Sequence, residues 1–370
     1  MWYRASLNRV RQGGDRSARI QHAQLRAAAL KVLEQLVAPG TPCALIDFPL
    51  HRNVGDSAIW LGERALLQQS RVSIEYVCDH ESFLERDLAD RLPSGTILIQ
   101  GGGNLGDLWP TSQHFRERII AGFPGHRIIQ LPQSIHFGDG ANLDRARAVF
   151  DAHPNFTLMT RDNQSLELAK EHFRAPSVLC PDMAFGLEHL PATPLPDYDI
   201  VWLSRDDHEA MPHPHRHRNP NVYEVDWSAG QEADRSWQAR EQFVRRERRA
   251  ILTSVARRPA SRLLHDRALW RAYDELAGLQ LVRGCRLLGR GRVIITDRLH
   301  GQILSALLGL PHVVLGDRNR KIRNYWDTWT AGWDLGRWAE SPEQAIELAD
   351  MTLRTMSLYP PDQSEGTPHA

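Results

Sequence analysis

The sequence predicts an α/β protein built from two doubly wound parallel-sheet domains that face each other across a cleft. Short apolar, β-branched runs alternate with helical segments from residue 43 to about residue 185, and the alternation restarts at residue 199. This order is typical of parallel sheets with helical crossovers. A Pro-rich polar stretch, residues 191–198, separates the halves and is typical of a linker. A chain of 370 residues has the length for two such domains.

The first half has a polar lead and a helix ahead of its sheet. Residues 1–16 are interrupted by glycines, and residues 20–37 have a helical apolar pattern that ends at a Pro-Gly pair. We therefore expect an N-terminal lead and helix over 1–40 and an α/β domain over 41–190. The predicted strands are 43–48, 73–78, 96–100, 127–134 and 156–160, and the predicted helices are 56–69, 80–91, 111–121, 142–152 and 165–173.

The second half repeats the pattern with longer helices. We expect the linker at 191–198, a second α/β domain over 199–341, and a terminal helix with a disordered tail over 342–370. The predicted strands are 199–205, 222–227, 293–296 and 312–316, and the predicted long helices are 233–256 and 266–289. No internal repeat is strong enough to indicate duplication.

Composition excludes several classes of function. Lys and Arg total 45, as do Asp and Glu, so nothing in the charge calls for nucleic acid. The four cysteines lie far apart without a CxxC pair, which argues against a zinc ribbon and a secreted disulfide framework. No run reaches the length of a membrane span. We expect a cytoplasmic protein, soluble or at most peripheral at the inner face of the cell membrane.

A loop with four histidines raises the question of a metal. The spacing of these histidines matches no standard metal site, and the surrounding prolines indicate an extended loop; they are His208, His213, His215 and His217. We expect no metal and no cofactor.

The most informative stretch is VIITDRLHGQILSALLGL, residues 293–310. A β-branched run meets Asp297, Arg298 and His300, and an apolar-periodic helix follows. Arg298 and His300 would then lie at a helix N-terminus, which suits a phosphate or carboxylate. The structural alternative is that Asp297 caps the helix, Arg298 pairs with an acid and His300 is a packing residue.

Two motifs in the first half follow predicted strands. Asn53, Gly55 and Asp56 open a helix after the first strand, where they either cap it or bind substrate. After the third strand, the run GGGNLGD at 101–107 formally contains G-x-G-x-x-G, but it lacks the acidic residue about twenty positions later that binds a dinucleotide ribose. We read its glycines as clearing space so that backbone N–H groups approach a ligand. The candidate binding residues here are Gly101, Gly102, Gly103, Asn104 and Asp107.

Further polar residues follow other predicted strands. Ser134 and Arg161 lie at the same predicted sheet edge in the first half, where turn chemistry is the alternative role. In the second half Arg205 ends the strand 199–205, and a second guanidinium would let one arginine bind a carboxylate and another a phosphate. Lys321 is the candidate ligand contact in a basic run that otherwise forms a solvated face. Tryptophans at 326, 329, 333 and 338 either stack on sugar rings or pack in the core.

Taken in order, these motifs resemble the polysaccharide pyruvyl transferase family. The match rests on NVGDSAI (53–59), GGGNLGDLW (101–109), PQS (132–134), RDNQS (161–165), PDMAF (181–185), LSRDD (203–207), TDRLHGQILSALLGLPHVVL (296–315) and KIRNYWDTW (321–329). The resemblance implies a GT-B-like pair of Rossmann-like domains. It also implies transfer of a pyruvyl group from phosphoenolpyruvate to sugar hydroxyls, forming a ketal in an exopolysaccharide or cell-surface polysaccharide. The family's Arg-Leu-His element falls on Arg298, Leu299 and His300. The chain departs from the family at Arg320, where glycine is common before the lysine.

This resemblance leads to a mechanism. We expect His300 to protonate C3 of phosphoenolpyruvate, Arg298 and Arg205 to bind the carboxylate and phosphate, and Asp56 or Asp107 to deprotonate the acceptor. The expected partners are phosphoenolpyruvate and a lipid-linked oligosaccharide. Two alternatives stand beside this: a GT-B glycosyltransferase that uses a nucleotide sugar, and a non-catalytic protein that binds a glycan or scaffolds an assembly complex.

Overall fold

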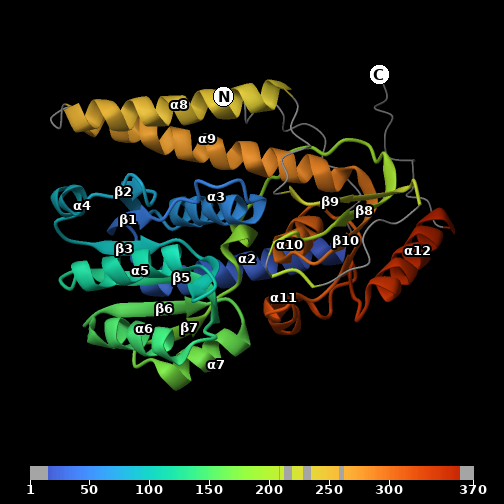
Figure 1. Cartoon of the computed structure of the whole chain (residues 1–370), viewed down its shortest axis with the longest axis horizontal. Helices are drawn as coiled ribbons and strands as arrows, with labels where there is room; N and C mark the ends of the chain where they lie inside the picture. Colours follow the sequence, from blue (N-terminus) through green and yellow to red (C-terminus); the bar gives the residue numbers. More distant parts are fainter. Residues whose placement is uncertain (1–15, 208, 212–218, 228–234, 258–261, 359–370) are drawn as a thin grey trace.

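The computed structural model describes residues 16–207, 209–211, 219–227, 235–257 and 262–358. Within these residues the chain forms two parallel sheets with helices packed around them (Figure 1). The predicted fold class, two Rossmann-like doubly wound units in a GT-B-like arrangement, is confirmed. The predicted lead, the histidine loop and the predicted tail fall largely or wholly outside the described residues, and the domain boundaries stay a prediction.

The first sheet has seven strands in the order β2-β1-β3-β5-β6-β7, with β4 paired to the second half of β5. Its central strands are apolar and buried throughout, as expected for strands covered on both faces. The strands are β1 (Pro42–Ile46), β2 (Ser73–Cys78), β3 (Thr96–Ile99), β4 (Gly102–Gly106), β5 (Arg127–His136), β6 (Phe156–Thr160) and β7 (Ser177–Leu179).

The helices of this half begin where capping residues occur in the sequence. Asn53 caps α3 by accepting a hydrogen bond from the Gly55 N–H, and Asp162 caps α7 through the Ser165 N–H. The helices are α2 (Arg16–Leu36), α3 (Val54–Gln69), α4 (Glu85–Arg91), α5 (Pro110–Gly122), α6 (Gly140–Ala152) and α7 (Asn163–His172), followed by the short helix η1 (Met183–Gly186).

The second sheet has five strands in the order β12-β11-β10-β8-β9. Its strands are β8 (Tyr198–Leu203), β9 (Val222–Val225), β10 (Gly291–Thr296), β11 (His312–Val314) and β12 (Gly336–Trp338). Its helical segments are α8 (Arg235–Arg257), α9 (Arg262–Gly289), α10 (Leu299–Leu307), α11 (Lys321–Tyr325), the π-helical turn η4 (Trp326–Thr330) and α12 (Pro342–Leu358). The strand that precedes Arg205 and the strand that precedes Arg298 are neighbours, because β8 pairs with β10.

Each sheet reverses its winding at one point. In the first sheet β2 lies on one side of β1 and β3 on the other; in the second, β9 and β10 lie on either side of β8. Ligands of open α/β sheets bind outside the carboxyl ends of strands at such switch points. The segments there are 47–56 and 100–103 in the first sheet, and 204–207 and 297–300 in the second.

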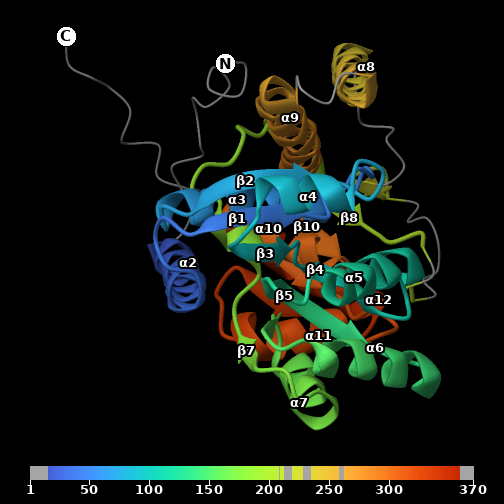
Figure 2. The same ribbon diagram turned by 90° about the vertical axis from the view of Figure 1, so that its left-hand side faces the viewer.

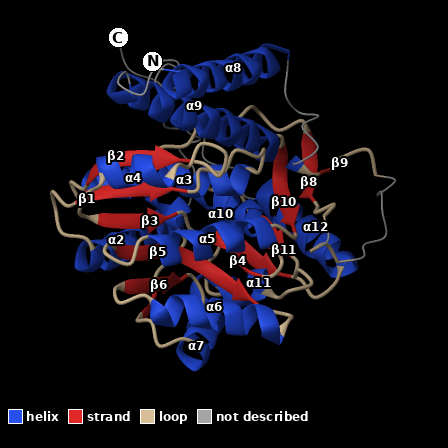
Figure 3. Ribbon diagram, turned by 60° about the vertical axis from the view of Figure 1, so that its left-hand side comes forward, coloured by secondary structure: helices blue, strands red, loops and turns tan. Residues whose placement is uncertain are grey.

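Helices α8 and α9 form a hairpin that lies along one side of both units (Figures 1 and 3). Although α9 lies between β9 and β10 of the second unit in sequence, its Tyr273 stacks on Phe48 of the first unit at a centroid distance of 4.2 Å. Asp274 likewise accepts a hydrogen bond from the Trp60 indole at 3.0 Å. One apolar core therefore continues from the first sheet through α9 to β10, and the hairpin fixes the two units relative to each other. Figure 2 shows α8 as the outer helix of the pair.

Candidate active site

The site is built around a contact between the two units. His300, at the start of α10, places Nε2 at 3.3 Å from Oδ2 of Asp182, which follows the last strand of the first sheet. The contact lacks hydrogen-bond geometry, so this buried Nε2 has no hydrogen-bond partner among the described residues. Asp182 can therefore stabilise an imidazolium at position 300 electrostatically while the ring nitrogen remains uncommitted.

Asp182 is fully buried and holds a second cation. Arg161 Nη1 donates to Asp182 Oδ2 at 2.8 Å, and Arg161 Nε donates to Ser134 Oγ at 3.0 Å. Burial alone would raise the pKa of Asp182, but the charges of His300 and Arg161 outweigh it and hold that pKa well below its usual range. Asp182 is thus a fixed anion between two cations.

Two glycines allow these cations to approach the backbone. A Cβ at Gly55 would lie 2.4 Å from His300 Nδ1, and a Cβ at Gly103 would lie 2.6 Å from Arg161 Nη2. Both distances are shorter than any side chain tolerates. The groups that Gly55 and Gly103 admit here are side chains of the protein, and the predicted approach of a ligand to the glycines of 101–107 stays a prediction.

Lys321 completes the link around Gly103. Its Nζ donates to the Gly103 carbonyl at 2.8 Å and also to the carboxylate of Glu209. Burial opposes ionisation of Glu209, but Lys321 and Arg205 together lower its pKa. Lys321, which the sequence predicted as a ligand contact, therefore lies where the first sheet's glycine segment meets the second sheet.

Arg205 and Arg298 both have carboxylate partners inside the protein. Arg205 donates to both oxygens of Asp207 at 3.0 and 2.9 Å and also to Glu209. Its backbone N–H donates to Asp297 at 2.8 Å, which ties β8 to β10. Asp297 thus serves this link, while Arg298 is the N-cap residue of α10 and makes no side-chain capping bond.

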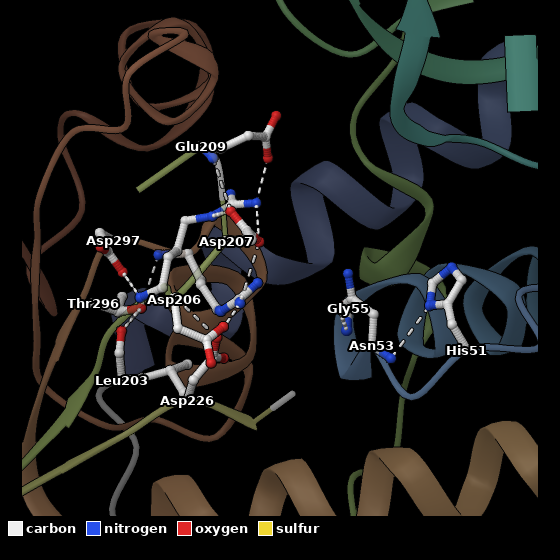
Figure 4. Close-up of polar contacts among 12 residues, drawn as sticks. His51, Asn53, Gly55, Leu203, Asp206, Asp207, Glu209, Asp226, Thr296 and Asp297 are labelled. Atoms are coloured by element: carbon white, nitrogen blue, oxygen red, sulfur yellow. Dashed lines mark hydrogen bonds and ion pairs between the residues drawn. The ribbon is translucent and has the colours of Figure 1, made fainter. Parts of the chain in front are cut away.

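The Arg298 guanidinium is held on the second unit. Its Nη2 lies 2.5 Å from Asp226 and 3.5 Å from Asp207, and its centre lies 5.8 Å from the Trp227 ring. Its Nε is buried and has no hydrogen-bond partner among the described residues. Figure 4 shows this carboxylate group, with Asp207, Glu209 and Asp226 labelled, opposite Asn53 and Gly55 of the first unit.

Asp56 lies at the glycine side of the site. Its Oδ2 is 3.5 Å from Nε2 of the exposed His51, and its Oδ1 would lie 3.6 Å from a Cβ at Gly102. Gly102 has a φ of +137°, a conformation that favours glycine. Asp56 is about a quarter exposed, so it can reach a solvent-borne hydroxyl.

Buried polar side chains hold the rest of the glycine-rich segment in place. The Gly101 N–H donates to Glu63 Oε1 at 2.8 Å, and the Asn104 N–H donates to Gln133 at 3.1 Å. Burial raises the pKa of Glu63 well above its usual range, which favours its neutral form. Arg116 fixes the Asn104 side chain through a 2.7 Å bond to Oδ1. Asn104 therefore supports the segment through its bonds to Gln133 and Arg116.

Other predicted residues have structural positions. Asp107 accepts the N–H groups of Gly138 and Asp139, both at 2.8 Å, and so holds the Gly138 loop. Ser134 donates to Asp162 at 2.6 Å and holds Arg161 in place. Leu299 is a buried core residue.

Sequence reasoning missed the carboxylates that position the cations. Asp182, Glu209 and Asp226 are all buried and each bonds a predicted cation. A signal existed for Asp182, because it lies three residues after the last strand of the first sheet.

The site can hold an anion through four titratable side chains: His300, Arg161, Lys321 and Arg298. The described residues contain no group of three or more His, Cys, Asp and Glu side chains that could hold a metal ion.

Comparison with known proteins agrees with this arrangement. The family model described as polysaccharide pyruvyl transferase matches residues 53–319. "Pyruvyl transferase 1" of Schizosaccharomyces pombe is 32% identical over 79% of this chain and 70% of its own length. "Putative pyruvyl transferase EpsO" of Bacillus subtilis is 32% identical over 77% of this chain and 84% of its own.

A solved structure shares the fold. The crystal structure of an uncharacterised protein from Klebsiella pneumoniae superimposes with a TM-score of 0.52, covering 88% of this chain and 99% of that one at 16% identity. At that identity the likeness shows the fold alone. The segment that the family model matches, residues 53–319, contains Asn53, Arg161, Asp182, Arg298 and His300, and Lys321 lies just beyond it. The chain belongs to the polysaccharide pyruvyl transferase family.

Proposed function

We propose that this protein transfers the pyruvyl group of phosphoenolpyruvate to two hydroxyls of a sugar in a cell-surface polysaccharide precursor, forming a cyclic ketal. The observation that carries the proposal is the continuous contact His300–Asp182–Arg161, joined at Gly103 to Lys321. It gathers a titratable imidazole and two further cations at the junction of the two sheets. Phosphoenolpyruvate requires this combination, because it carries a phosphate, a carboxylate and a carbon that must be protonated.

The donor's two anionic groups would bind the cations around Gly103. Among the described residues Arg161 bonds through Nε and Nη1 and leaves Nη2 without a hydrogen bond, and Lys321 has a third N–H beyond its bonds to Gly103 and Glu209. The buried Arg298 Nε is a further unused donor. Charge-assisted bonds of these kinds are the strong ones for phosphate and carboxylate. Arg205, whose donors are taken by Asp207 and Glu209, would position Glu209 and so Lys321.

His300 would supply the proton that starts the reaction. The imidazolium, stabilised by Asp182, gives its proton to C3, and an acceptor hydroxyl bonds to the electron-poor C2. The second hydroxyl then bonds to C2 as the C2–oxygen bond to phosphate breaks. Of the two hydroxyl protons, one restores the imidazolium and the other leaves with phosphate, so the sequence balances without an oxidant or reductant. Asp56 is placed to accept the first of these protons.

The two alternatives differ in their reaction products. A nucleotide-sugar glycosyltransferase would release a nucleoside phosphate and transfer a sugar, and a binding protein would release nothing. The uncommitted Nε2 of His300 argues for proton transfer, which a binding protein does not require.

The test is a mass-spectrometric assay of the acceptor. The protein is incubated with phosphoenolpyruvate, or in parallel with nucleotide sugars, and with nitrophenyl glycosides and lipid-linked sugars as acceptors. We expect an adduct with the mass of pyruvate less one water, together with one inorganic phosphate released per adduct. A hexose adduct from a nucleotide sugar would replace the proposal with the first alternative, and no adduct with any acceptor would favour the second.

A further inference from the structure

Helix α8 has an exposed side that the site does not use. It is the outer helix of the α8–α9 hairpin (Figures 1 and 2), and its inner side contacts α9 and the first unit. Its buried positions, Trp237, Glu241, Val244 and Arg248, recur every three or four residues and form the stripe that faces α9 and the first unit. The opposite side of the helix therefore points away from the protein.

That outward side carries mainly positive charge, with one exposed carboxylate, Glu247, on its flank. Helix α8 contains seven arginines and two glutamates. Glu241 is buried, and Glu247 lies on the flank at the 100° per residue spacing of a helix. Arg235, Arg246 and Arg249 lie on the outward side and are exposed. Among the described residues, no carboxylate makes an ion pair with Arg246 or Arg249.

An aromatic ring lies among these arginines. Phe243 is 48% exposed, and Arg240 at the edge of this side lies 5.1 Å above its ring. We call Arg235, Phe243, Arg246 and Arg249 the outer arginine face. The arginines extend over roughly 21 Å of helix at about 1.5 Å per residue. Basic side chains around an apolar ring on one helix side are typical of helices that lie at a membrane surface.

The inner side of the same helix holds a loop of the site. Glu241 binds the Arg52 guanidinium with bonds of 3.0 and 2.6 Å, and Arg245 donates to the Leu50 carbonyl at 3.0 Å. This loop leads directly to Asn53 and Gly55, and Gly55 contacts His300. The outer arginine face is therefore separated from the loop beside the catalytic histidine by one helix diameter, about 10 Å.

We propose that the outer arginine face docks this protein on an anionic lipid membrane, which brings the 50–55 loop to within about one helix diameter of acceptors carried in that membrane. The docking itself stands on the charge and exposure of α8; its purpose rests on the proposed transfer to a lipid-linked sugar. Phe243 favours a lipid surface over nucleic acid, because an exposed ring gains by entering the boundary between headgroups and acyl chains. Because the chain has no net charge, its electrostatic attraction to an anionic membrane must come from a local patch such as this face.

The test is co-sedimentation of the full chain with lipid vesicles. We use vesicles of phosphatidylcholine alone and vesicles of phosphatidylcholine mixed with phosphatidylglycerol, at low and high salt. Binding should occur to the anionic vesicles only and weaken as salt screens the charges. Each basic residue near an anionic surface contributes roughly fivefold to binding. The triple variant R235Q/R246Q/R249Q should therefore lose binding on the order of 100-fold, and F243A should weaken it further.

A matched variant separates this face from charge in general. R86Q/R337Q/R354Q removes three exposed arginines from α4, β12 and α12 and should bind as the wild type does. No binding of the wild type to anionic vesicles, equal loss in both triple variants, or equally strong binding to a DNA duplex would overturn the proposal. Both triple variants should keep wild-type activity on a soluble acceptor. If the wild type is inactive on every acceptor, that result counts against the proposed function. The vesicle experiment still tests the docking independently.

Discussion

The His300 ring lies against the backbone of Gly55, so that a Cβ at position 55 would come within 2.4 Å of His300 Nδ1. The two residues belong to different units, and their contact sets the position of the imidazole relative to Asp182 and Arg161. The two units therefore pack so closely here that a single methyl group does not fit between Gly55 and His300.

Replacing Gly55 with alanine should lower kcat strongly. The added methyl group must displace the imidazole, and a displacement of about 1 Å can cost on the order of 10²-fold in rate. Circular dichroism and the midpoint of urea unfolding would report the fold, and initial rates of phosphate release would report activity. Gly122→Ala is the control, because nothing lies within 4 Å of its Cβ position. Equal activity of both variants would show that His300 needs no fixed position.

Arg298→Lys should raise the KM for phosphoenolpyruvate by about tenfold or more. A lysine ammonium cannot bond Asp226 and at the same time present a second N–H in the plane of the guanidinium. Either the ion pair with Asp226 or the contact with phosphoenolpyruvate is therefore lost. Titration of phosphoenolpyruvate against initial rate measures the change. Arg337→Lys, an exposed arginine on β12, is the control. An unchanged KM in Arg298→Lys would remove Arg298 from the donor site.

His312, a fully buried residue of β11, should make the protein less stable as pH falls below 6.5. Burial lowers the pKa of His312 to about 4, opposed by a bond to the Leu310 carbonyl. Between pH 6.5 and 4 the unfolded chain binds a proton that the folded protein does not, so stability rises with pH across this window. The loss should be roughly 2 kcal/mol between pH 7 and pH 5.

Urea unfolding at several pH values measures this effect. The variant His312→Gln, whatever its stability at pH 7, should lose less stability than the wild type on going from pH 7 to pH 5. Identical losses in the two proteins would show that His312 does not titrate in this way.

Arg320→Gly should stabilise the protein. Arg320 precedes α11 with a φ of +58° and ψ of 14°, in the left-handed region where a side chain costs about 1 kcal/mol. Its backbone makes the turn that delivers Lys321 to Gly103, so the conformation cannot relax. Unfolding free energy should rise by up to about 1 kcal/mol, reduced by the extra freedom of glycine in the unfolded chain. A decrease would mean that the Arg320 side chain makes a stabilising contact.

The sequence predicted the fold because its signals are local. Apolar runs, capping residues and the Pro-rich break locate the strands and helices without knowledge of what packs on what. One further rule, that polar residues after parallel strands meet at one edge of a sheet, selected candidate residues in each unit. In the structure Gly55, Gly103, Arg161, Lys321 and His300 lie together where the two units meet.

The partners of these residues could not be predicted in the same way. Arg205 and Arg298 were expected to bind the donor, and both have carboxylate partners of their own that come from a loop and from the segment after β9. Asp107 is at the right sheet edge but is used to hold the Gly138 loop. Which acid meets which cation depends on the packing of the two units, and no sequence spacing contains that information. The departure at Arg320, in contrast, was visible in sequence, and its backbone conformation explains why glycine suits the position.

The central claim is that His300 protonates C3 of phosphoenolpyruvate as the ketal forms. The most direct measurement is to run the reaction in D₂O and examine the ketal methyl group by NMR and mass spectrometry. One deuterium per methyl group is expected with the wild type, and His300→Ala should form product about 10²–10⁴ times more slowly while remaining folded. A ketal methyl without deuterium, or a His300→Ala rate close to that of the wild type, would contradict the account.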